Sequence, residues 1–155
     1  MADIWPRLRI AILLALITGL WCWLLTALHG IWSFGIVHEY LYGGRIPFSP
    51  TFPVTYGSFF IDALGAFAAP FLLLIIVCAI VPRQYHLMSV ILGWLIGAWI
   101  GASNISFMYQ IDFGTTWGPF EAFRALFFHP IVTPFWLIFG VLGTVSLTRP
   151  VRGRP

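Results

Sequence analysis

The stretch VILGWLIGAWIGASN, residues 90–104, has a glycine at every fourth position and no charged side chain. Gly93, Gly97 and Gly101 share one face of a helix, because residues four apart are neighbours on its surface. Asn104 follows three residues later near the same face. Leucine gains nothing by leaving lipid, so membrane helices associate where small residues allow close approach. The stretch therefore predicts a membrane helix that packs against protein along its glycine face.

The whole chain has the composition of a membrane domain. Of its 155 residues, 60% are hydrophobic and 8% are charged, whereas about a quarter are charged in a soluble domain. The eight tryptophans and 15 phenylalanines fit this class, since aromatic rings are enriched at membrane interfaces. The basic residues are scattered arginines, so the net charge of +3 does not indicate nucleic-acid binding. We expect one membrane domain over residues 1–155.

Four segments are long and apolar enough to cross the hydrocarbon core, which takes about 20 residues. They cover about residues 10–30, 58–81, 87–109 and 125–147. The sequence therefore predicts an all-α integral membrane protein with four transmembrane helices. The first segment lacks a small-residue cleavage site and is interpreted as an uncleaved helix. Pro70 predicts a kink in the second segment.

The arginines predict the orientation. One side of the membrane would hold Arg7, Arg9, Arg83, Arg149, Arg152 and Arg154, and the other only Arg45 and Arg124. Because cytoplasmic segments are enriched in arginine, both termini are expected in the cytoplasm. We expect a multi-pass protein of the cell inner membrane with two long extracytoplasmic loops.

Aromatic side chains crowd the first of these loops. They include Trp32, Tyr40, Tyr42, Phe48, Phe52 and Tyr56. The first half of the loop has no breaker stronger than glycine, so the first helix either continues to about Tyr42 or bends onto the interface. The second half has three prolines and is predicted to be irregular. The loop is interpreted either as an aromatic belt in the headgroup layer or as a docking surface for a partner subunit.

Each predicted helix carries a stripe of small residues and one strongly polar residue near its outer end. These polar residues are His29, Asp62, Asn104 and His129. An ionisable group in a span costs about 2.5–3.5 kcal/mol on insertion scales, so it usually faces the bundle. The sequence thus predicts a polar intramembrane layer, with helix packing assigned to Gly93, Gly97, Gly101 and Gly140.

The polar layer admits several functions. It could register the helices through hydrogen bonds alone. His29 and His129 could be axial ligands of a haem or pigment. The same histidines with Asp62 could hold a metal ion, with His38 and Glu39 nearby. Asp62, the single acidic residue inside a span, could be a proton or cation site for transport.

Catalytic motifs are missing from the sequence. No serine lies in a G-x-S-x-G elbow and no H-E-x-x-H occurs. Cys22 and Cys78 fall at different depths and are expected to be free thiols. We therefore expect no enzyme but a small non-catalytic subunit of a larger inner-membrane complex, in contact with lipid and other membrane subunits. The alternatives are a small oligomeric transporter or channel using Asp62, and a cofactor- or metal-binding subunit using His29 and His129.

Overall fold

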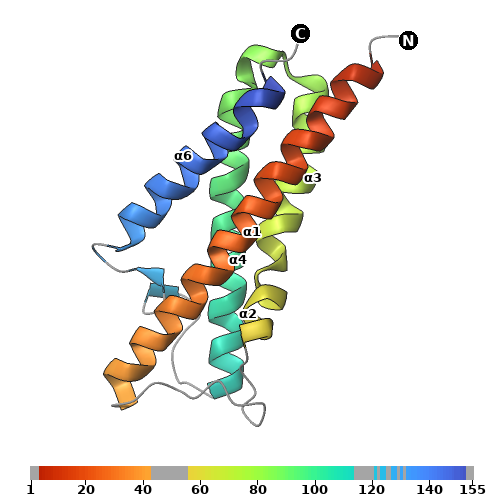
Figure 1. Ribbon diagram of the computed structural model, residues 1–155. Helices are drawn as coiled ribbons and strands as arrows, with labels where there is room; N and C mark the ends of the chain where they lie inside the picture. The colour runs from red at the N-terminus through yellow and green to blue at the C-terminus, as the bar shows by residue number, and fades with distance from the viewer. Residues whose placement is uncertain are drawn as a thin grey trace.

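A computed structural model describes residues 4–42, 56–113, 121, 123–124, 127–128, 130 and 132–152 (Figure 1). For residues 4, 34–42, 109, 112 and 113 it describes the backbone alone. The helices are α1 (Ile4–Tyr42), α2 (Tyr56–Asp62), α3 (Leu64–Ile80), the short 3₁₀ turn η1 (Arg83–Tyr85), α4 (His86–Phe113) and α6 (Val132–Arg152). No strand occurs in this described part of the chain.

Four stretches of helix are long and apolar enough to cross a membrane. They are Trp5–Ser33, Tyr56–Ile80, Arg83–Met108 and Val132–Arg152. The predicted class of a multi-pass, all-helical membrane protein is confirmed at this level. The start of α1, the turn between α3 and α4 and the end of α6 lie at one end of the bundle, so the first and last described residues are at that end (Figure 1).

The first helix is longer than its predicted span of 10–30. α1 has 39 residues, a length of about 58 Å at 1.5 Å per residue, whereas the hydrocarbon core is about 30 Å thick. The first half of the predicted aromatic loop is therefore helix, and Trp32, Tyr40 and Tyr42 belong to α1. Glycine alone does not stop a helix in an apolar run, which explains the continuation. Phe48 and Phe52 lie outside the described residues.

Two further boundaries differ from the predicted spans. The second span is interrupted between α2 and α3 at Ala63, while α3 continues through Pro70. The fourth helix begins at Val132 rather than at residue 125 and continues to Arg152. Pro130, two residues before it, lies in a turn.

α1 and α4 pack on each other and lie between α3 and α6, each of which contacts both. α6 buries one residue per turn from its ninth residue onward: Gly140, Thr144, Thr148 and Val151. Towards its start, α6 leans away from α4 (Figure 1). The tight part of the bundle is therefore α1, α3 and α4, with α6 attached near its C-terminal end.

The glycine face of α4 meets α3 at closest range around Pro70. Proline has no N–H, so the carbonyl of Ala66 lacks its usual helical donor. A methyl group added at Gly97 would lie 2.8 Å from that Ala66 oxygen and 2.8 Å from Cδ of Pro70. One added at Gly101 would lie 2.6 Å from Cβ of Ala66. The carbonyl freed by proline thus faces the Cα–H of Gly97, a geometry suited to a weak Cα–H···O hydrogen bond.

Tryptophans attach α6 to the rest of the bundle. The indole N–H of Trp21 donates to the carbonyl oxygen of Gly140 at 3.0 Å, and that of Trp136 donates to Leu25 at 3.3 Å. Both bonds join α1 to α6. Trp94 of α4 is fully buried where Gly140 provides space, since a methyl group there would lie 1.9 Å from its ring. These tryptophans therefore serve helix contacts inside the bundle, which differs from the interfacial placement inferred from composition.

We expect Gly97→Val to lower the free energy of unfolding by about 1–3 kcal/mol, because the added carbons overlap a backbone carbonyl and a proline ring that cannot swing aside. The matched control is Ala68→Val, at an exposed position of α3. Thermal unfolding of both purified variants in detergent measures the difference. An equal effect of the two substitutions would contradict the close contact described for Gly97.

Candidate functional site

His29 lies in an aromatic box towards the end of the bundle away from the termini. Its side chain is 5% exposed. The imidazole stacks on Phe127 with centroids 5.1 Å apart and an interplanar angle of 14°, and its centroid is 4.5 Å from that of Trp136. Nδ1 lies 3.1 Å from Oγ of Ser33, one turn further along α1. We call His29, Ser33, Phe127 and Trp136 the His29 box.

The box is built from three parts of the chain. α1 supplies His29 and Ser33, which are four residues apart and therefore on the same face. Phe127 precedes the turn at Pro130, and Trp136 lies in the second turn of α6. The sequence places Trp136 in register with Gly140, one turn away, whereas Phe127 carries no pattern that links it to His29. Phe127 and Trp136 both contact His29, and the turn at Pro130 lies between them in the chain.

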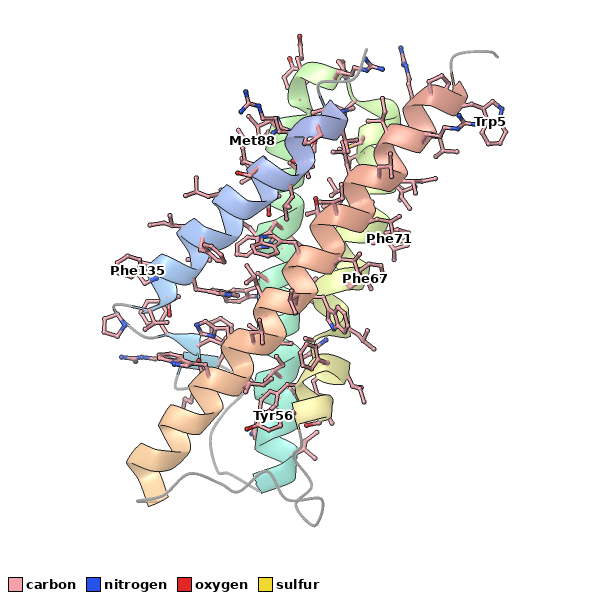
Figure 2. The ribbon with its side chains drawn as sticks, viewed as in Figure 1. Trp5, Tyr56, Phe67, Phe71, Met88 and Phe135 are labelled. Carbon is pink, nitrogen blue, oxygen red and sulfur yellow. The ribbon has the colours of Figure 1, made fainter. Side chains whose placement is uncertain are left out.

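Two apolar grooves flank the box, and Trp136 lines both. The groove between α1 and α6 has a volume of about 370 Å³ and includes Leu28, His29, Trp32, Phe135 and Phe139 in its wall. The groove between α4 and α6 has a volume of about 300 Å³ and includes Leu95, Ala98, Trp99, Phe128 and Leu137. Both exist because α6 leans away from the inner helices. Figure 2 shows Phe135 directed outward from the start of α6.

Asn104 lies at the outer edge of the seam between α3 and α4. Its side chain is exposed, and its Nδ2 atom would be 2.6 Å from a methyl group added at Gly65. The position that continues the glycine face inward is Ile105, which is 2% exposed and approaches Gly30. At 3.6 residues per turn, the step of three from Gly101 to Asn104 rotates the amide outward, while the step of four rotates Ile105 inward.

Asp62 is half-buried at the end of α2, where the helix breaks. One carbonyl group near this break has a side-chain donor: the indole N–H of Trp23 donates to the oxygen of Phe60 at 2.7 Å. Asp62 and Asn104 thus belong to α2 and the α3–α4 seam, whereas His29 belongs to the side where α1 meets α6. His129 lies outside the described residues, so a shared polar layer of all four stays a prediction.

The described residues contain no group of three His, Cys, Asp or Glu side chains that could hold a metal ion. His38, Glu39 and His129, which the metal and haem hypotheses need, have no described side chains. Cys22 and Cys78 are free and buried, as expected. No protein-family model, curated protein or solved structure gave a significant match to the chain.

The His29 box, on this geometry, is a rigid packing centre with a polar anchor. We expect His29→Ala to lower the free energy of unfolding by about 2–4 kcal/mol, because it leaves a cavity between two aromatic rings. His29→Phe keeps the ring contacts and loses the bond to Ser33, so its cost is expected to be less than about 1.5 kcal/mol. Tryptophan fluorescence during thermal unfolding would measure both. Equal losses in His29→Phe and His29→Ala would show that the bond to Ser33, which both variants lack, matters more than the ring packing.

Proposed function

We propose that the protein is a small non-catalytic subunit of a larger complex in the cell inner membrane, with both termini in the cytoplasm. It supplies helix surface to a transmembrane helix of another protein. The observation that carries this proposal is the exposed position of Asn104 on a membrane-spanning helix.

An exposed side-chain amide in a span favours a protein neighbour over lipid. Asn104 makes no side-chain hydrogen bond with the described residues of its own chain, although it has donors and an acceptor. Lipid tails cannot satisfy these groups, and an unsatisfied polar group costs several kcal/mol in hydrocarbon. A helix that offers a polar side chain at this depth would satisfy them.

The surface around Asn104 suits such a helix. On α4 it is flanked by Phe107 and Ile111, which are 52% and 57% exposed. On α2, Ile61 is 67% exposed, and on α3, Leu64 is 51% exposed. Gly65, next to Leu64 and in contact with Asn104, adds no side chain that would hold a partner away. Tyr56, the first residue of α2, is 54% exposed and adds an aromatic ring to the surface on which a partner would dock, whereas the exposed Trp32 lines the groove between α1 and α6.

We expect the tagged chain, purified in mild detergent, to carry a second membrane protein in fixed ratio, and Asn104→Leu to reduce its recovery about tenfold. An interhelical hydrogen bond in a membrane is worth about 1–2 kcal/mol, and 1.4 kcal/mol is tenfold in affinity. Leu92→Ala, at an exposed position of α4 more than three turns from Asn104, is the matched control and is expected to change recovery less than about twofold.

Native mass spectrometry of these variants distinguishes the occupants. A complex of two copies of this chain that is lost in Asn104→Leu would replace the partner helix by a second copy. Full recovery of the partner in Asn104→Leu would remove the observation on which the proposal stands.

One observation favours a second candidate, a small oligomeric transporter or channel. The carboxylate of Asp62 lies where its span is interrupted, and transporters typically build ion sites at broken helices. Against this candidate, the described interior beside α4 is filled by Trp94, Leu74 and Val90, each fully buried.

Asp62→Asn separates the two candidates, because it keeps the size of the side chain and removes its charge. The subunit proposal expects the co-purifying protein to be retained within about twofold in this variant. Transport expects a homo-oligomer whose ion flux into proteoliposomes is abolished by the same substitution. Flux that depends on Asp62 in a protein without a partner would favour transport.

A further inference from the structure

A basic pocket lies at the end of the bundle that carries both termini. It has a volume of about 200 Å³, and its polar wall is formed by Arg7, Arg83 and His86. These residues come from the start of α1, from η1 and from the first position of α4. The pocket is therefore assembled by three elements, which the fold brings together at the end of the bundle where α1 begins and α3 turns into α4.

The wall is held in place by the turn between α3 and α4. Val81 and Pro82 are extended, which ends α3 and directs the chain back into α4. Nε2 of His86 lies 3.3 Å from the carbonyl oxygen of Val81, and the imidazole is 4% exposed. The imidazole is thus fixed against the turn, while Arg7 and Arg83 are exposed and have long side chains that can adjust to a ligand.

The electrostatic setting favours an anion. Arg9, Arg149 and Arg152 lie at the same end of the described bundle. The acidic residues that the structure places, at positions 39, 62, 112 and 121, belong to segments towards the other end. The positive end of the α4 dipole also lies here, because α4 begins at His86.

The residues around the pocket are typical of the depth of lipid headgroups. Its floor is apolar and includes Ile10, Cys78 and Val81, whereas its rim carries the arginines. Trp5, next to this end of α1, is 68% exposed, and Tyr85 is 53% exposed. Exposed tryptophan and tyrosine mark the interface between hydrocarbon and water. Figure 2 shows Trp5 directed away from the bundle at this level.

We propose that this pocket binds the phosphate group of an anionic phospholipid. Arg7 and Arg83 donate hydrogen bonds to the phosphate oxygens, in the paired geometry that guanidinium groups favour. The apolar floor contacts the glycerol and the first carbons of the acyl chains. A basic pocket between membrane helices is a typical site for such headgroups. The proposal is independent of the partner helix at Asn104.

The test uses the full chain in detergent micelles and three probes: dioleoylphosphatidylglycerol, dioleoylphosphatidylcholine and inorganic phosphate. Thermal unfolding is followed against the concentration of each probe, and bound lipid is counted by native mass spectrometry. We expect phosphatidylglycerol to raise the unfolding midpoint, with phosphatidylcholine and inorganic phosphate needing at least about tenfold higher concentrations for the same rise.

The variant pair Arg7→Gln and Arg83→Gln is expected to raise the phosphatidylglycerol concentration for half-maximal stabilisation about tenfold. The control pair Arg9→Gln and Arg149→Gln removes the same charge from the same end but outside the pocket, and is expected to change it less than about twofold. Arg7→Gln alone, at an exposed position, keeps the test valid if the double variant does not fold. Equal effects of the two pairs would overturn the pocket in favour of general surface charge. Inorganic phosphate acting as well as the lipid would overturn the lipid assignment.

Discussion

The contact between Pro70 of α3 and Gly97 of α4 sets the geometry of the bundle. Proline removes an N–H from α3 and leaves the carbonyl of Ala66 without its helical donor. In hydrocarbon no water can replace that donor, so the carbonyl must face a neighbouring helix. Gly97 and Gly101 give it a neighbour whose backbone comes close enough. Once α3 and α4 are joined there, α1 fills the groove beside them with its own small residues, such as Ala15, Thr18 and Thr26, all fully buried.

The attachment of α6 follows different physics. Its contact with α4 consists of a large ring on a glycine, Trp94 on Gly140, rather than backbone on backbone. A ring of that size holds the helices further apart, and Trp136 and Phe127 fill the space that opens below it. The indole N–H bonds of Trp21 and Trp136 then fix α6 to α1, with the Trp21 ring packed on Gly143. The two apolar grooves and the His29 box are consequences of this one wide contact.

The sequence was informative where periodicity and chemistry pointed the same way. Four spans, the glycine face of α4 and the buried stripe of α1 could be predicted, because small residues at spacings of three and four have one physical use in lipid. The orientation of Asn104 could not be predicted. A spacing of three and a spacing of four both place a residue near the glycine face, but across a seam only about 10 Å wide one side chain points outward and the other inward. The break at Ala63 carries no glycine or proline of its own and depends on tertiary contacts such as Trp23 to Phe60. The contact between His29 and Phe127 could not be predicted either, because Phe127 lies next to a turn whose direction the sequence does not specify.

The positions of the polar groups divide the protein into two ends with different neighbours. Where a guanidinium group lies at headgroup depth, water and lipid phosphate are both available, so an exposed arginine there carries little cost. Asn104 lies four residues before the end of the Arg83–Met108 stretch, and where lipid tails surround its amide, its exposure has a cost until another chain covers it. The same degree of exposure therefore has opposite meanings at the two ends. At the end with the termini it fits a lipid ligand, and along the α3–α4 seam it fits a protein helix. A membrane subunit with a lipid site at one end and a partner helix along the α3–α4 seam would be held in orientation by the lipid, and the partner would cover its exposed amide.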